Sequence, residues 1–555
     1  MKMSRFSKSA LSAIAAVSLI VGIPGSAQAG LSVPADTPNV GLYMVENFQL
    51  GSMPSQLFAA VIPSDATTYL MCKSAEDARC VAARIVFGIG GLDVCTDSIK
   101  MSCIQDVWAV DPSNKKIPGE FVKDVQRLET QQFDEIPSIK MQGSHSLGAI
   151  WRIPGVVNSA GTEEYFVAAE DRLWATKNPN SPLSSARVDP ENFNAGIVPI
   201  KSIAGKYAVL KASDYETGNG AWGSRPEGEV KTPDGQQCVI TDATFCGLRA
   251  QFPEGYRFGM SLRIGNLPTG WFAGRLGLPL ITTSKKDGVD VLSIEATPLQ
   301  VPSLDFVVPN AEIPAEARKM IFDGSQWGRG GTKSWQLLSD PSDPRMMALL
   351  VAMAPAYKNT ATKTDSTWSF KTMVGNNDSR DVINRCSSTI GTFGGLVTSN
   401  AITYSDGAPA YDASTGALTY KVASPHYREN GKVALGTYDL AIRSNVVRCI
   451  YNFSNAPIQA TISILSEDGE NQVATTVVNE RNGWLYLSAK GYTFSSPTIS
   501  VKLSQSAAAE ATPSPTATSA AKANAKKTIT CTKGKVVKKV TGAKPVCPKG
   551  YSRTA

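Results

Sequence analysis

The chain has 555 residues, of which 42% are hydrophobic, 19% charged and 8% aromatic, and its formal net charge is +7. At about 100–200 residues per domain, this length allows three or four globular domains. Ordinary Gly and Pro usage and the modest charged fraction exclude a wholly disordered, collagenous or coiled-coil chain.

Residues 1–29 have the pattern of an export signal. Lys2, Arg5 and Lys8 precede the apolar run Leu11–Val21, and the segment ends in the small-residue sequence Ala-Gln-Ala. This is the three-part layout of a secretory signal peptide, and the apolar run is shorter than the roughly 20 residues that span a bilayer. We therefore expect cleavage after Ala29, a secreted protein located outside the cell or at its surface, and no transmembrane segment in the mature chain.

Ten cysteines in an exported chain predict five disulfides. Neighbouring cysteines fall into pairs, three of them separated by seven residues, so we expect the bonds Cys72–Cys80, Cys95–Cys103, Cys238–Cys246, Cys386–Cys449 and Cys531–Cys547. Spacing alone leaves the connectivity among the first four open. Zinc is the competing interpretation, but the chain has no C-x2-C pair and only two His. We therefore predict no metal site, and the sequence indicates no cofactor.

Residues 30–150 form a disulfide-bearing N-terminal region that contains one predicted helix. Ser74–Asp77 resembles a capping box, and apolar residues recur at helical spacing from Ala78 to Ile85. Gly88 then supplies a stop signal. The pattern predicts a short helix that ends near Gly88.

Residues 151–385 form a middle region that combines strands with two helices. Short apolar or alternating runs between turn residues predict antiparallel strands at Tyr165–Ala168, Tyr207–Leu210, Phe258–Ile264, Val289–Ile294 and Leu304–Val308. A first helix would place Ile313, Ala317 and Ile321 on one face, and Asp343-Pro344 opens a second.

Residues 386–505 give the clearest strand pattern. Apolar residues alternate over positions 460–464, Asp468-Gly469 supplies a turn, and Gln472–Val478 is predicted to return as the second strand of a hairpin. We expect an antiparallel β-sandwich-like domain, but no Trp lies between its two cysteines, as an immunoglobulin domain would require. The predicted fold class is a multidomain, β-rich α+β protein with a few short helices in its N-terminal and middle regions.

The chain ends in a linker and a basic module. Residues 506–527 are rich in Ala, Ser, Thr and Pro and lack the apolar residues of a core. Residues 528–555 place strand-forming residues around two cysteines, which predicts a disulfide-stapled hairpin. From Ala511 to Ala555 there are ten Lys or Arg and no acidic residue.

This basic tail is the predicted binding element. Clustered Lys attracts anionic polymers and lipid headgroups, and the candidate residues are Lys533, Lys535, Lys538, Lys539, Lys544 and Lys549. The alternative is that these lysines only keep a small hairpin soluble. Export argues against nucleic acid as a partner.

Three segments carry a resemblance to known proteins. Thr530-Cys531, Lys538-Lys539 and Cys547-Pro548-x-Gly550-Tyr551 resemble a C-terminal module of many secreted actinobacterial proteins of unknown function. Cys95-x7-Cys103-Ile-x-x-Val107 and Trp271-x-x-Gly274-Arg275-x-x-x-Pro279 are similar to segments of large, uncharacterised exported actinobacterial proteins. The resemblance implies a cell-envelope or extracellular setting and brings no catalytic residues.

Candidate catalytic motifs are incomplete. Ser144–Gly148 is similar to an esterase elbow, but Ser144 replaces the first Gly and the following Ala149–Pro154 reads as a strand instead of a helix. Gly328–Ser334 is similar to a phosphate-binding loop, but the residue before its Lys is Thr. The acidic stretches Asn376–Asp381 and Glu467–Glu470 do not fit the spacing of a calcium-binding EF-hand.

Acidic residues could still form a glycosidase pair, since such pairs are defined only in space. Glu163, Glu164, Glu170 and Asp171 are the clustered candidates. Without an intact motif we name no catalytic residue and expect a structural, adhesive or ligand-binding protein of the cell envelope. The alternative is an extracellular hydrolase that acts on polysaccharide or cell-wall glycan.

Overall fold

The structure is a computed structural model in which the chain forms two compact units, one ending at Gln505 and the other beginning at Ser506. It describes residues 39–44, 56–61, 68–126, 132–207, 209–212, 224–227, 231–322, 335–338, 344–373, 382–388, 393–405, 407–465, 471–472, 475–494, 497–505, 527–542 and 544–554. The predicted signal peptide and, apart from Lys527, the predicted linker lie outside these residues. The first unit is called the body below, and the second contains the basic module.

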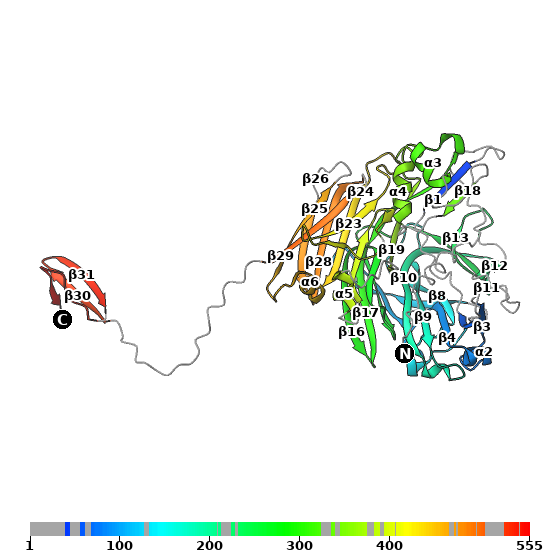
Figure 1. Ribbon diagram of the computed structural model, residues 1–555, viewed down its shortest axis with the longest axis horizontal. Coiled ribbons are helices and arrows are strands. Elements are labelled where there is room, and N and C mark those ends of the chain that lie inside the picture. The colour runs from blue at the N-terminus through cyan, green and yellow to red at the C-terminus, as the bar shows by residue number, and fades with distance from the viewer. Residues whose placement is uncertain are drawn as a thin grey trace, which may run out of the picture. The chain divides into compact units, whose positions relative to one another are not determined.

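Strands dominate the body, which confirms the β-rich fold class (Figure 1). Before residue 386 they are β1 (Asn39–Met44), β2 (Gln56–Val61), β3 (Thr68–Cys72), β4 (Ile85–Gly91), β5 (Cys103–Val110), β6 (Lys116–Pro118), β7 (Glu120–Gln126), β8 (Ser146–Arg152), β9 (Glu164–Thr176), β10 (Arg187–Ala204), β11 (Val209–Ala212), β12 (Ser224–Glu227), β13 (Cys238–Asp242), β14 (Phe245–Arg249), β15 (Arg257–Ile264), β16 (Gly270–Lys286), β17 (Val289–Pro309), β18 (Trp335–Leu338) and β19 (Lys363–Thr372). Those that follow are β20 (Phe393–Ser399), β21 (Thr403–Tyr404), β22 (Ala410–Asp412), β23 (Ala417–Ala423), β24 (Leu435–Arg443), β25 (Ile458–Leu465), β26 (Asn471–Gln472), β27 (Thr475–Arg481), β28 (Trp484–Thr493) and β29 (Thr498–Gln505).

One large sheet runs through the body. Its ladders follow the order β3-β2-β4-β9-β10-β19-β16-β20-β24-β28-β27. All are antiparallel except the β16–β20 ladder, which is parallel and pairs Phe272 with Leu396. Strands on both sides of residue 386 therefore belong to one sheet, and the 151–385 and 386–505 regions are joined by backbone hydrogen bonds.

A second sheet, β6-β5-β15-β17-β16, packs against the first. Buried side chains from both sheets form one apolar cluster, to which Phe258 and Leu292 contribute from the second sheet and Trp368 and Trp484 from the first. Trp151 joins the cluster from β8, which pairs with β9 of the first sheet. Two layers around a shared apolar core are a standard way to bury a sheet face.

The C-terminal part of the body is a β-sandwich. A sheet in the order β21-β23-β29-β25-β26, with β22 added on β23, faces strands β24 and β28 of the large sheet. Leu418 and Val501 from one sheet and Leu440 and Leu487 from the other lie in one buried cluster. The expected sandwich is therefore present, and one of its layers is part of the large sheet.

The expected return strand over Gln472–Val478 was wrong in its pairing. Only β26 turns back on β25, with Gln472 opposite Ile464. β27 instead pairs with β28, where Val477 lies opposite Ser488. The two segments lie in different sheets because the chain crosses from one layer of the sandwich to the other after β26.

Five helices and three short 3-10 helices accompany the described strands: α2 (Ala78–Ala82), α3 (Ala315–Phe322), α4 (Pro344–Met353), α5 (Val382–Ser388), α6 (Ser444–Tyr451), η3 (Pro137–Ile139), η4 (Leu183–Ser185) and η6 (Asn310–Glu312). α3 and α4 lie beside β1 and share an apolar cluster with it, as the two helices expected in the middle region (Figure 1). α6 lies in the C-terminal region, where only strands were expected. Within the described ranges, no helix is both long and apolar enough to cross a membrane.

The N-terminal helix is shorter than its pattern suggested. The helix begins after Asp77, whose carboxylate accepts hydrogen bonds from the N–H groups of Arg79 and Lys73 at 2.9 Å each. It ends at Ala82, and Ile85 already belongs to β4. The helical pattern failed there because β4 pairs with β2 and β9 and is buried on both faces from Val86 to Gly91. A strand buried on both faces has an apolar run whose spacing does not distinguish it from a buried helix.

All ten cysteines are oxidised, in the bonds Cys72–Cys80, Cys95–Cys103, Cys238–Cys246, Cys386–Cys449 and Cys531–Cys547. These are the nearest-neighbour pairs. Each of the first three closes a short local loop, whereas the fourth joins α5 to α6.

The basic module is a three-stranded antiparallel sheet in the order β31-β30-β32, with β30 (Lys527–Lys533), β31 (Val536–Gly542) and β32 (Ser552–Thr554). The expected hairpin gains its third strand from the residues that follow Tyr551. Ile529 and Cys531 are buried, and the bond from Cys531 to Cys547 ties the long connection to the central strand.

Candidate functional site

The Ser144–Gly148 motif lies where a folded-back segment meets β8. A pair of backbone bridges, the outer one between Phe133 and Ser144, folds residues 132–144 into a short antiparallel loop. Lys140 at its turn adopts a left-handed conformation with φ of 54°. After this loop, His145 directly precedes β8. The residues that follow the motif form a strand, as expected.

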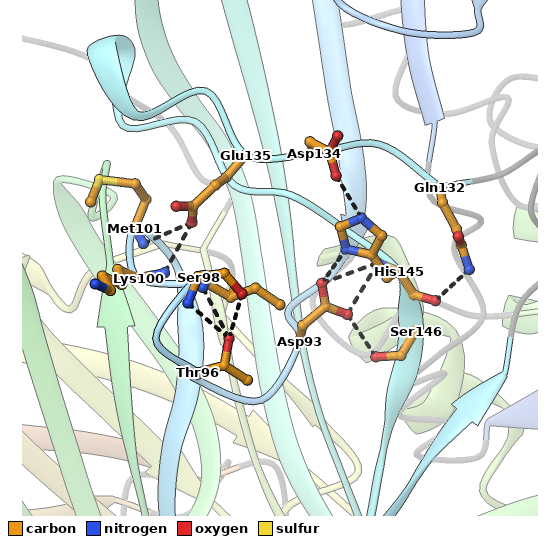
Figure 2. A network of polar contacts seen from close by, with 11 residues as sticks. Asp93, Thr96, Ser98, Lys100, Met101, Gln132, Asp134, Glu135, His145 and Ser146 are labelled. Carbon is orange, nitrogen blue, oxygen red and sulfur yellow. Dashed lines mark hydrogen bonds and ion pairs between the residues drawn. The ribbon is translucent and has the colours of Figure 1, made fainter.

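The folded-back segment is docked on the loop that the Cys95–Cys103 disulfide closes (Figure 2). Oε2 of Glu135 accepts hydrogen bonds from the backbone N–H groups of Lys100 and Met101, both at 3.0 Å. A carboxylate that receives two amide donors holds the two loops in a fixed register.

His145 lies between two carboxylates in this contact (Figure 2). Its Nδ1 is 2.8 Å from Oδ2 of Asp93, and its Nε2 is 3.0 Å from Oδ1 of Asp134. The Asp93 side chain is 7% exposed and that of Asp134 is 96% exposed. The cluster therefore has a buried and a solvated end, and we call Asp93, His145 and Asp134 the ion triad.

The carboxylates determine the protonation state of the imidazole. Hydrogen bonding to Asp93, opposed by burial and supported by Asp134, raises the pKa of His145 to about 9. The ring is then an imidazolium at neutral pH, with both N–H groups donating. A doubly donating imidazolium has no lone pair with which to accept a proton, so this geometry does not provide a general base.

The two serines of the motif are also not placed to act as nucleophiles. Ser144 and Ser146 are 0% and 2% exposed, respectively. The hydroxyl of Ser146 donates to Oδ1 of Asp93 at 3.0 Å. The serine and the histidine thus share one carboxylate as neighbours, instead of forming a relay from hydroxyl to imidazole to carboxylate. The arrangement supports a structural junction between two loops.

A cavity of about 490 Å³ adjoins the ion triad. Its wall combines apolar side chains such as Phe133 and Leu183 with charged ones such as Lys73, Glu76 and Asp134. Of the Ser144–Gly148 motif, only His145 lines this cavity.

The clustered carboxylates Glu164 and Glu170 lie far apart along one strand. Glu164 opens β9 and Glu170 lies six residues further along the same strand, a separation of about 20 Å at 3.3 Å per residue. Oε2 of Glu164 accepts from the N–H of Ser202 at 3.1 Å, and burial raises the pKa of Asp171 well above its usual range. Glycoside hydrolysis requires a separation of about 5–10 Å across a cleft, and Glu164 and Glu170 are too far apart along β9 to provide it.

The remaining candidate motifs lie outside the described residues: the Gly-rich stretch Gly328–Ser334 and the acidic stretches Asn376–Asp381 and Glu467–Glu470. Within the described part of the chain, no three His, Cys, Asp or Glu side chains gather as they would around a metal ion.

The six candidate lysines are all described and all exposed on the basic module: Lys533, Lys535, Lys538, Lys539, Lys544 and Lys549. The exposed valines Val536 and Val537 lie between them, 56% and 61% exposed, respectively. The module thus presents cationic and small apolar groups on a rigid, disulfide-bonded sheet.

Sequence reasoning named His145 but not its partners. Asp93 and Asp134 are 52 and 11 residues away from it in the chain. The acidic pair Asp134-Glu135 and the acid two residues before Cys95 were the available signals, but only the fold shows that they converge.

Comparisons with protein-family models, with curated proteins and with solved structures found no match to this chain.

Proposed function

We propose that this protein is a secreted binding protein of the cell envelope, without catalytic activity, whose basic module attaches it to anionic envelope polymers. The observation that carries the proposal is the composition of the module. Six lysines are exposed on a small folded sheet, and no acidic residue occurs after Ala511 to neutralise them. Uncompensated positive charge of this density attracts polyanions over about one Debye length.

Two further observations support the proposal. Five disulfides suit a protein that works in an oxidising compartment, as an exported protein does. The one His-containing motif similar to a nucleophile site is engaged in an ion triad, in which His145 and Ser146 both bind Asp93.

The test uses the full-length protein and a variant in which the six lysines of the module are replaced by Gln. We expect wild-type protein to fractionate with the envelope and to be released by added salt, and the variant to be found mainly in the soluble fraction. A matched control replaces six exposed lysines of the body by Gln: Lys201, Lys206, Lys285, Lys286, Lys319 and Lys432. The control should remain bound.

Two results would contradict the proposal. If both variants remain with the envelope as completely as wild type, and salt releases none of them, the module is not the anchor. If purified protein hydrolyses cell-wall glycan or an ester, and one acidic or Ser substitution abolishes that activity, the protein is the extracellular hydrolase of the alternative hypothesis.

A further inference from the structure

The strand register gives the basic module two chemically different faces. Side chains of directly opposite residues in antiparallel strands point to the same face. Cys531 is opposite Lys538 on β31 and Arg553 on β32, whereas Thr530 is opposite Lys539 and Thr554. Lys538 and Lys539 are therefore adjacent in sequence but project from opposite faces of the sheet.

One face is closed by the module itself. It contains Ile529 and Cys531, which are 6% and 0% exposed, and the disulfide bond to Cys547 crosses it. Nζ of Lys538 lies 5.9 Å from the ring centroid of Tyr551, which comes from the long connection between β31 and β32. We call this the covered face.

The opposite face carries three threonines on β30, two hydroxyl residues on β32 and one on β31, and we call it the hydroxyl face. Besides Val537 and Lys539 it holds Thr528, Thr530, Thr532, Thr541, Ser552 and Thr554. In a β-sheet such groups repeat about every 6.8 Å along a strand and about 4.8 Å between strands. The strands thus give this face a largely polar array, in which Lys539 is the one cationic strand residue.

The hydroxyls have hydrogen-bonding capacity left for a ligand. Thr554 donates its hydroxyl to the carbonyl oxygen of Thr530 at 3.2 Å, and the hydroxyls of Thr528 and Thr541 are 2.8 Å apart. A hydroxyl that donates its proton still has two acceptor lone pairs. These acceptors suit a partner that carries many hydroxyl donors, and Lys539 suits a partner that also carries acidic groups.

We propose that the hydroxyl face binds an acidic polysaccharide, with Lys539 engaging an acidic group of the polymer and the threonines, Thr530 foremost, engaging its hydroxyls. This inference rests on the proposed attachment function and specifies its ligand class and the face that recognises it. The charge complementarity favours this occupant, because the module carries no acidic residue that would repel a polyanion. Attraction to charge alone would favour the covered face, because Lys533, Lys538 and Arg553 share the face of Cys531. Recognition of a hydroxylated polyanion would instead use the hydroxyl face.

The adjacent lysines supply a charge-matched experiment on the full-length protein. Lys539→Gln and Lys538→Gln remove the same charge from neighbouring exposed positions, and Thr530→Val removes a hydroxyl while keeping a β-branched side chain suited to a strand. Binding to polygalacturonate, as the acidic polysaccharide probe, is measured by affinity electrophoresis at fixed ionic strength. We expect Lys539→Gln to weaken binding by about fivefold or more, because it removes a charge-assisted contact with the polymer. Lys538→Gln should weaken binding by less than about twofold, because it removes only diffuse electrostatic attraction. Thr530→Val should weaken binding by about threefold.

The outcomes separate this inference from the proposed function. Equal losses for Lys538→Gln and Lys539→Gln would overturn the face-specific inference and leave electrostatic attachment standing. If the variant lacking all six lysines also binds polygalacturonate and envelopes as wild type does, both fail. A difference between the two lysines that occurs on vesicles of anionic phospholipid, but not on polygalacturonate, would assign the face to lipid headgroups and reject the polysaccharide. Mass spectrometry of the Cys531–Cys547 bond confirms that each variant module is folded.

Discussion

Replacing Arg275 tests how the large sheet of the body is held together. Arg275 lies in β16 and is only 2% exposed. Its guanidinium donates to the carbonyl oxygens of Ser399 at 2.7 Å and Ala401 at 2.6 Å, and lies 4.8 Å from the ring centroid of Tyr404. Ser399 ends β20, and Ala401 and Tyr404 follow it, so one cation bridges β16 to the entry of the C-terminal sandwich.

The expected magnitude follows from what each substitution leaves behind. Arg275→Ala leaves two buried carbonyl oxygens unsatisfied, at about 1–3 kcal/mol each, and opens a cavity. Removal of the buried charge offsets part of this loss, since burying a charge is itself unfavourable. We expect a net decrease in the free energy of unfolding of about 3–5 kcal/mol for Arg275→Ala. Arg275→Met fills much of the volume and should lose only about 1–3 kcal/mol.

The assay is equilibrium unfolding in guanidinium chloride, followed by tryptophan fluorescence at neutral pH. Arg187→Ala is the matched control, because Arg187 and its partner Asp189 have side chains 78% and 51% exposed. Such a surface pair contributes less than about 1 kcal/mol. If Arg275→Ala has the same transition midpoint as this control, the guanidinium does not hold the two segments together and the reasoning is refuted.

Two further predictions concern the ion triad and the disulfides. Because the pKa of His145 is raised from about 6.5 in the unfolded chain to about 9, the triad contributes its full stability below pH 6.5 and loses it as the pH rises to 9. His145→Gln should therefore flatten the decline in melting temperature between pH 6.5 and 9. The pH-dependent loss in the free energy of unfolding should shrink by about 1–2 kcal/mol, after allowance for solvent exposure. An unchanged slope would rule out the triad as the source of the decline. Replacing Cys386 and Cys449 together by Ala should destabilise the body by about 4 kcal/mol, against about 2.5 kcal/mol for Cys72 and Cys80, because the first bond closes a 63-residue separation and the second one of eight; the reverse order in calorimetry would contradict this ranking.

Features encoded by local spacing could be predicted from the sequence. The alternating runs around Phe258–Ile264 and Val289–Ile294 are strands, and Asp343-Pro344 does precede a helix, α4. These patterns depend on side-chain periodicity and on Pro at a helix start, which act over a few residues. These elements are therefore encoded by local patterns.

Strand pairing and the hydrogen-bond partners of side chains depend on residues far apart in the chain, so the sequence did not predict them. Residues near Ile85 had the spacing of a helix but form β4, because ladders to β2 and β9 satisfy both of its edges. The chain after Gln472 had the spacing of a hairpin but pairs across the sandwich. Likewise His145 could be named as a candidate, while Asp93 could be assigned to it only from the fold.

The segments Cys95–Val107 and Trp271–Pro279 lie at joints of the fold. Nε1 of Trp271 donates to the hydroxyl of Ser387 at 3.1 Å, and its ring lies over Gly395, where an added Cβ would be 2.2 Å from the ring. Together with the buried Arg275, this joins β16 to α5 and β20.

The Cys95–Cys103 segment has a corresponding role in the N-terminal region. Its disulfide closes the loop that carries Asp93 at its entry, and the N–H of Ile104 donates to the carbonyl oxygen of Asp93 at 2.9 Å. The disulfide and this backbone hydrogen bond thus hold the backbone of Asp93 where its side chain can reach His145. Buried members of both segments, such as Ile104, Trp271 and Arg275, bind other parts of the body and so account for its folding. Ligand recognition needs side chains that face solvent, and on the module all six candidate lysines are exposed. The proposed attachment is therefore tested by substitutions on the module, whereas substitutions such as Arg275→Ala test the stability of the body.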